Sequence, residues 1–168
     1  KNAVKLFQAT NVEALKLEGA YPYQLQLIKR LTEVGIPVMG HIGLTPQSVH
    51  QQGGYFIHGK DEISREQLLE FAFKLQDAGC FSIVLECVDA ELATKITAQL
   101  SIPTIGIGSG INCDGQVLVI NDLFKMGTQR PPKFCEPILD LYEARKQALE
   151  VYFSRWREKV KHENSFYL

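Results

Sequence analysis

The stretch SIVLECV, residues 82–88, runs through three consecutive apolar residues to Glu86 without alternating polar and apolar positions. A strand with one face in water alternates, whereas a strand that is covered on both faces does not. Gly79 lies just before the run and Asp89 just after it, so the run has the length of a strand. We therefore predict a buried strand of a parallel α/β sheet, covered by helices on both faces or closed on itself.

Four more runs of strand length alternate with helical patterns. One helix is expected to begin near Pro22 and end before Gly35, a second to begin at Ser64 as its N-cap and end before Gly79, and a third to follow Asp89. Such alternation is typical of βαβ units. The additional strands are predicted at about residues 14–17, 36–41, 104–108 and 116–120.

Two longer segments complete the chain. Residues 45–61 show no periodicity and contain three glycines, which predicts a long binding loop or lid. From about residue 136 to residue 160 the apolar residues fall on one stripe of a single long helix. That stripe fits packing on the chain's own sheet or on another subunit, and the sequence favours neither.

Composition excludes several classes of function. The chain has 168 residues, with 18 basic and 19 acidic side chains, so it lacks the positive surplus of a nucleic-acid-binding protein. No apolar run approaches the roughly 18 residues needed to span a bilayer. The four cysteines form no C-x-x-C pair, which favours free thiols over a zinc or redox site. We expect a cytoplasmic protein that binds neither nucleic acid nor membranes. The first residues, KNAVKLF, are typical of a cut end.

Polar residues at the carboxyl ends of parallel strands are the first candidates for a site. Lys16 and Glu18 lie two apart at the end of the first predicted strand, so both point to one side. Lysine can hold a carboxylate or keto oxygen of a substrate, and a carboxylate beside it can ligate a hard cation. The alternative for Lys16 and Glu18 is an exposed ion pair.

Glu86 is the most informative single residue, because a carboxylate is rarely placed in apolar surroundings without a partner. It is suited to remove a proton from a carbon next to a carbonyl group. The alternative is a surface carboxylate just past the end of its strand. His41 ends the second predicted strand and either contacts a ligand or is a core histidine satisfied by the backbone.

The glycine-rich run GIGSG, residues 106–110, lacks the lysine of a P-loop, so a plain βα turn is the simpler interpretation. Asp114 is expected to support that turn. Together, a basic group, a carboxylate for a cation and an acid/base carboxylate suggest a metal-assisted enzyme that enolises a small 2-oxo acid.

Six motifs make the hypothesis more specific. They are LKLEG (residues 15–19), GHIGLTPQSV (40–49), GGY (53–55), VLECV (84–88), IPTIGIG (102–108) and CDGQVLV (113–119). In this order they resemble the ketopantoate hydroxymethyltransferase family over essentially the whole chain.

The resemblance implies a TIM (β/α)8 barrel of the phosphoenolpyruvate/pyruvate superfamily, and transfer of a hydroxymethyl group from 5,10-methylenetetrahydrofolate to 3-methyl-2-oxobutanoate with Mg²⁺ in pantothenate biosynthesis. It implies that Glu86 is the base, that Lys16 and His41 bind substrate, and that Glu18 is associated with the metal. It also suggests a ring-like homo-oligomer, a decamer. Ala20, Ser109 and Asn164 depart from the family's usual glycine, alanine and histidine.

The resemblance also implies that something is missing, because the family's first three strands carry two metal-binding aspartates and a substrate-binding serine. We expect residues 1–168 to be one partial barrel domain, strands 4 to 8 plus the long helix, from a longer chain, and inactive alone. Two alternatives remain: a non-catalytic remnant or interaction subunit, and another 2-oxo-acid lyase of the superfamily, which the VLECV run disfavours.

Overall fold

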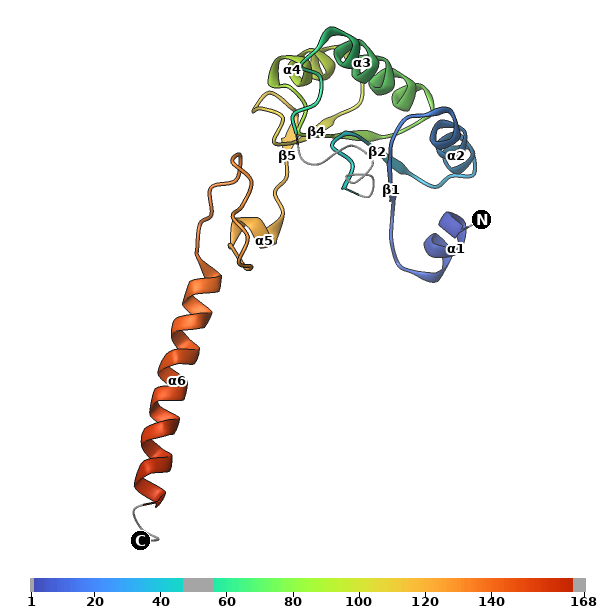
Figure 1. The fold of residues 1–168 in the computed structure, drawn as a ribbon. Helices are drawn as coiled ribbons and strands as arrows, with labels where there is room; N and C mark the ends of the chain where they lie inside the picture. Colours follow the sequence, from blue (N-terminus) through green and yellow to red (C-terminus); the bar gives the residue numbers. More distant parts are fainter. Residues whose placement is uncertain (1, 47–55, 165–168) are drawn as a thin grey trace. The chain divides into compact units, whose positions relative to one another are not determined.

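A five-stranded parallel sheet organises the N-terminal part of the chain in the computed structural model, which describes residues 2–46 and 56–164 (Figure 1). Its strands are β1 (Leu15–Glu18), β2 (Val38–Gly43), β3 (Ser82–Glu86), β4 (Thr104–Ile107) and β5 (Gly115–Gln116). They lie side by side in chain order, and every pair is parallel. The order never reverses, unlike that of a doubly wound sheet. The predicted parallel α/β architecture is confirmed, while residues 47–55, the centre of the predicted long loop, lie outside the described residues.

The helices between the strands begin largely where the sequence indicates. The elements are α1 (Asn2–Ala9), α2 (Pro22–Glu33), α3 (Glu62–Asp77), α4 (Ala90–Gln99), α5 (Ile120–Leu123) and α6 (Leu141–Asn164). Asp89 caps α4 as its position suggests, accepting the Leu92 N–H. The predicted N-cap of α3 is wrong: Asp61 caps it and accepts the N–H of Ser64, whose own hydroxyl accepts the Gly59 N–H.

The core lies between the sheet and the helices α2, α3 and α4. The buried residues Ile28 and Leu31 of α2, and those of α3 and α4, pack with strand residues such as Val38 and Leu85. Since side chains alternate along a strand, the residues between these core positions point to the opposite face of the sheet. That second face carries the candidate site.

The chain divides into two compact units, residues 1–117 and residues 118–168. The predicted strand over residues 116–120 is wrong except at its start. Val119 accepts the N–H groups of Asp122 and Leu123, so the chain turns into α5 instead of extending the strand. The long helix begins at Leu141, later than predicted, where Asp140 accepts the Glu143 N–H.

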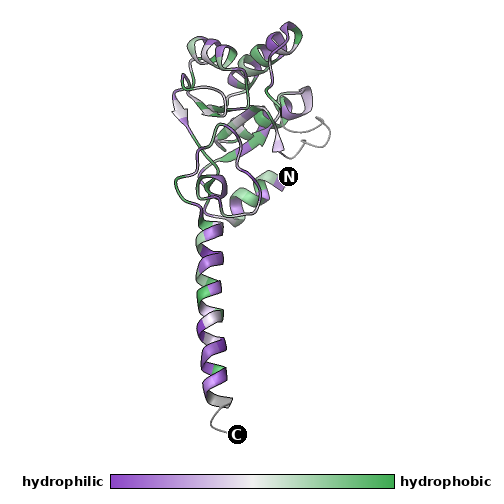
Figure 2. Cartoon of the chain, turned by 60° about the vertical axis from the view of Figure 1, so that its left-hand side comes forward, coloured by the Kyte–Doolittle hydropathy of each residue, from purple (hydrophilic) through white to green (hydrophobic). Residues whose placement is uncertain are grey.

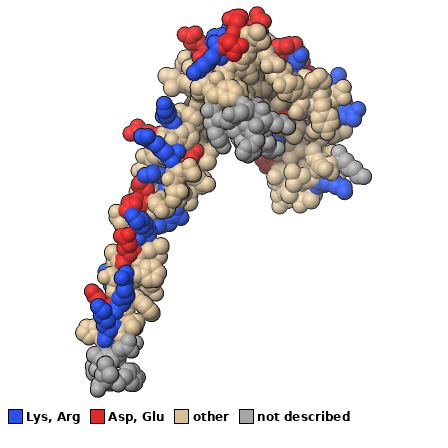
Figure 3. All heavy atoms as spheres, in the orientation of Figure 1, with Lys and Arg blue, Asp and Glu red and all other residues tan. Residues whose placement is uncertain are grey.

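Helix α6 is predominantly hydrophilic, with apolar positions interspersed (Figure 2). On the face that Figure 3 shows, acidic and basic side chains both lie along this helix. Its larger apolar side chains, among them Tyr152 and Trp156, are exposed. Among the helices of the described residues, none has the length and apolar character needed to cross a membrane.

Candidate active site

The four residues selected from the sequence share one face of the sheet, the face opposite the helices. Residues that pair across parallel strands point to the same side. Glu18 of β1 pairs with His41 of β2, and Glu86 of β3 pairs with Gly43, two residues beyond His41. Lys16 lies two residues before Glu18 and therefore joins the same face. Lys16 is exposed, whereas Glu18 is half-buried.

His41 and Glu86 are in direct contact. The imidazole Nε2 lies 3.1 Å from the Glu86 carboxylate oxygen Oε2, with the two side chains only 1% and 15% exposed. The angles fall outside hydrogen-bond geometry, and within the described residues neither nitrogen of His41 has a hydrogen-bond partner. The alternative of a core histidine satisfied by the backbone is therefore wrong. The alternative of a surface Glu86 is also wrong, because Glu86 is the last residue of β3 and is largely buried.

The backbone around Glu86 is held from both neighbouring strands. Its carbonyl accepts the Leu44 N–H at 2.7 Å, and the Cys87 N–H donates to Ile107 at 2.9 Å. Cys87 itself has a φ of +50°, a left-handed conformation that is uncommon outside glycine. A strained residue next to a candidate base persists only where the surroundings fix it. These bonds fix the backbone from which the Glu86 side chain projects.

Ser109, one of the departures from the family pattern, completes this arrangement. Its buried hydroxyl donates to the Leu85 carbonyl at 2.7 Å and accepts the Val88 N–H at 3.0 Å. The turn that contains it has positive φ at Gly108 and Gly110, as expected, but it leads from β4 to β5 without a helix between them, so it is not the predicted βα turn. Asp114 accepts the N–H of Thr104 at 2.8 Å, so it ties the segment after the turn to the start of β4.

Cys87 is not an alternative nucleophile. Burial, and then the negative charge of neighbouring Glu86, raise the pKa of the Cys87 thiol to about 11. The thiol is therefore protonated at neutral pH, and it is the thiolate that attacks. All four cysteines are free, as the sequence analysis expects.

A cavity of about 380 Å³ opens at the carboxyl ends of β1 and β2. It adjoins the candidate site through Glu18 and Gly43 and is also lined by residues of α2 and α3. Its lining also includes Gly19, Tyr21, Gln24, Ile42, Thr45, His58, Ser64, Gln67, Leu68 and Phe71. His58 could not be found from the sequence, because it lies in the aperiodic segment, where no pattern distinguishes it from its neighbours.

Metal ligands are scarce in this chain. No three acidic, histidine or cysteine side chains of the described residues gather closely enough to hold a metal ion. Glu18 brings one carboxylate to the site, whereas Mg²⁺ requires near-octahedral coordination by oxygen atoms. The residues present therefore do not form a magnesium site by themselves.

We accordingly expect the 168-residue chain to bind Mg²⁺ weakly, with no saturation below about 1 mM, because a single carboxylate leaves most of the coordination to water. Calorimetric titration of the metal-free chain with MgCl₂ measures this, with the Glu18→Gln variant as its control. Tight, stoichiometric binding that disappears in the variant would show that the chain carries a complete site.

The sequence pattern of the family described as ketopantoate hydroxymethyltransferase matches residues 1–163. A 3-methyl-2-oxobutanoate hydroxymethyltransferase of Anaeromyxobacter sp. is 48% identical over 160 residues, which are 95% of this chain and 52% of the relative. One of Bdellovibrio bacteriovorus is 51% identical over 150 residues, 89% of this chain and 57% of the relative. One of Carboxydothermus hydrogenoformans is 49% identical over 158 residues, which are 94% of this chain and 57% of the relative. The chain thus spans about half the length of the curated relatives it matches.

Proposed function

Because the chain belongs to the ketopantoate hydroxymethyltransferase family, we propose that the whole protein moves a hydroxymethyl group from 5,10-methylenetetrahydrofolate to 3-methyl-2-oxobutanoate. The product would be 2-dehydropantoate. The observation that carries the proposal is the buried Glu86 carboxylate, aimed from the end of β3 and contacted by His41 at 3.1 Å.

The fold that we propose is a TIM barrel in which β1 to β5 are strands 4 to 8 of a single domain. Two observations support it: the strands follow one another in chain order, and the helices α2 to α4 pack on one face only. In a closed barrel the other face lines the interior, where side chains at the carboxyl ends of the strands form the active site. Five strands cannot close such a barrel. The remaining strands would belong to the part of the relatives that this chain does not cover.

In the proposed reaction the Glu86 carboxylate accepts the proton from C3 of the 2-oxo acid. The electron pair of the broken C–H bond becomes the C2–C3 double bond of an enolate, and the electron pair of the C2 carbonyl moves onto its oxygen. Water opens the methylene bridge of the folate, which releases tetrahydrofolate and leaves the one-carbon unit at the oxidation level of formaldehyde. C3 of the enolate then bonds to that carbon, the electron pair of its C=O bond moves onto oxygen, and a proton completes the hydroxymethyl group. The ammonium of Lys16 would bind the acid's carboxylate or keto oxygen. The Mg²⁺ that the resemblance implies would take Glu18 as one ligand and require others from outside this chain.

We infer that His41 holds Glu86 in position in addition to its proposed contact with substrate. Its ring is buried against the carboxylate, and a displacement of a base by about 1 Å can cost up to about a hundredfold in rate. We therefore predict that His41→Gln in the full-length protein lowers kcat by about 10- to 100-fold and changes KM for the 2-oxo acid less. Steady-state kinetics measures both constants. An increase in KM alone would leave His41 only the substrate-binding role.

The test of the proposed function is formation of 2-dehydropantoate by the full-length protein, followed by mass spectrometry. We expect product only when the 2-oxo acid and 5,10-methylenetetrahydrofolate are both present. Cleavage of another 2-oxo acid without folate would favour a lyase of the superfamily. No turnover of any such acid by the full-length protein would favour a non-catalytic interaction protein.

Assembly and location are part of the same proposal. We infer a homo-oligomer, because α6 leaves aromatic side chains such as Trp156 exposed and the resemblance suggests a decamer. We also infer a cytoplasmic protein, from the free cysteines and the biosynthetic activity proposed. Light scattering of the full-length protein would measure the oligomeric state directly.

A further inference from the structure

The chain leaves β3 through a strained turn directly after the candidate base. Glu86 is the last residue of β3, and the next residue, Cys87, has a φ of +50°. This left-handed conformation is costly for a residue with a Cβ and persists only where the surroundings hold it. Because the Glu86 side chain projects from this backbone, the contacts that hold residues 85–88 bear on where its carboxylate lies.

The hydroxyl of Ser109 joins the two sides of this turn. It donates to the Leu85 carbonyl at 2.7 Å and accepts the Val88 N–H at 3.0 Å. One oxygen atom thus bridges the residue before Glu86 and the residue after Cys87. Ser109 is buried, so bulk water does not replace either bond when the hydroxyl is removed.

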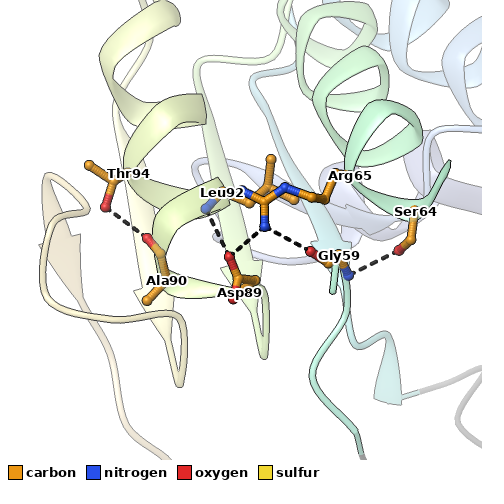
Figure 4. Close-up of polar contacts among 7 residues, drawn as sticks. All are labelled: Gly59, Ser64, Arg65, Asp89, Ala90, Leu92 and Thr94. Atoms are coloured by element: carbon orange, nitrogen blue, oxygen red, sulfur yellow. Dashed lines mark hydrogen bonds and ion pairs between the residues drawn. The ribbon is translucent and has the colours of Figure 1, made fainter. Parts of the chain in front are cut away.

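The far end of the segment is anchored separately, at Asp89 (Figure 4). The Asp89 carboxylate accepts the N–H of Leu92 as the N-cap of α4, and it accepts a hydrogen bond from the guanidinium of Arg65 at 2.9 Å. Both contacts form without Ser109. Val88 directly precedes this anchored residue, so the Val88 N–H offers the Ser109 hydroxyl a fixed point.

Ser109 is in turn held by the turn that contains it. Gly108 and Gly110, on either side, have φ values of +63° and +80°. A Cβ at Gly110 would lie 2.7 Å from the Cβ of Ala90, the first residue of α4, so the turn packs closely on the start of that helix. The helix start that Asp89 caps therefore also supports Ser109.

We propose that Ser109 is a positioning residue for the Glu86 carboxylate, which it holds through the backbone at Leu85 and Val88. The inference rests on the proposed function, in which Glu86 removes a proton, and adds to it a residue that acts only through the backbone. Alanine, which the family usually has at this position, can form neither of the two hydrogen bonds. The serine therefore gives this chain an additional constraint on its base.

The test compares Ser109→Ala with Ser82→Ala in the full-length protein. Ser82 is the matched control, because it is a buried serine at the opposite end of β3 whose hydroxyl donates to the Pro103 carbonyl at 2.9 Å. Each variant loses a buried hydroxyl, so each should have a lower melting temperature than the parent. Rates are measured below the melting temperature of every variant.

The measured reaction is deuterium exchange at C3 of the 2-oxo acid without folate, followed over a range of acid concentrations. We expect Ser109→Ala to lower the maximal exchange rate by about 3- to 10-fold and to leave the KM for the acid unchanged, because a small displacement of the base affects the proton transfer more than binding. Ser82→Ala should exchange at the parent rate.

The outcomes separate this inference from the proposed function. A maximal rate that falls in Ser109→Ala and is kept in Ser82→Ala would support the positioning role. The parent rate in Ser109→Ala, an equal decrease in both variants, or a change in KM alone would overturn that role and leave the proposed function in place. No exchange by the parent protein would overturn the proposed function, and the role of Ser109 with it.

Discussion

Replacement of Glu86 by glutamine in the full-length protein is expected to lower kcat for hydroxymethyl transfer by about 10²- to 10⁴-fold, the usual contribution of a general base. Glutamine has nearly the same shape and still meets His41, but its amide cannot accept the C3 proton. The KM for the 2-oxo acid should change little, because Glu86 acts on the bond that breaks. Steady-state kinetics of parent and variant measures both constants.

The matched control for this substitution is Glu66→Gln. Glu66 is exposed on α3, a helix on the face of the sheet opposite Glu86, and it is not a candidate site residue. It should retain the parent kcat. A Glu86→Gln variant with the parent kcat would exclude Glu86 as the base. The circular dichroism spectrum and the midpoint of thermal unfolding would show whether a variant is folded, and so distinguish a loss of folding from a loss of catalysis.

The second large effect is expected from Gly43→Ala, which should destabilise the protein by about 3 kcal/mol or more. Gly43 has a φ of +92°, and a Cβ there would lie 2.1 Å from the Glu86 carbonyl oxygen and 2.7 Å from the Val88 side chain. The strand ends of β2 and β3 would have to separate, which would break the Leu44 to Glu86 hydrogen bond and displace the carboxylate from His41.

Gly35→Ala provides the comparison. Gly35 has a similar φ of +83°, but nothing lies within 4 Å of the added Cβ. It should therefore show only the backbone cost of about 1–2 kcal/mol. Urea unfolding of the parent and both variants measures the free energies of unfolding. Equal losses of unfolding free energy in Gly43→Ala and Gly35→Ala would contradict the close approach of β2 to the Glu86 carbonyl.

That Lys16 and Glu18 share a side could be predicted from the sequence, because the period of two in a strand fixes which of its own side chains point the same way. The face that they share with His41 and Glu86 could not be predicted, because it depends on the register between strands. The contact between His41 and Glu86 could not be predicted either. This contact depends on the register in which Gly43 pairs with Glu86. The two strands are far apart in the sequence, and no local pattern fixes how they pair.

Two predictions of secondary structure were also wrong at positions where the local sequence fits two patterns. Val117, Val119 and Ile120 are typical strand residues, yet the carbonyl of Val119 starts the helical turn of α5. Asp61 and Ser64 both suit an N-cap, and only the structure shows that the aspartate accepts the backbone N–H. His58 carries no local pattern, since its place beside Cys87 and Asp89 comes from tertiary hydrogen bonds alone.

The most direct measurement of the central claim, that Glu86 is the base at the end of β3, is deuterium exchange at C3 of 3-methyl-2-oxobutanoate in heavy water. The full-length protein is incubated with the acid without folate, and the C3 proton is followed by nuclear magnetic resonance. We predict exchange with the parent protein and its loss with Glu86→Gln. Exchange by Glu86→Gln at the parent rate would contradict the account.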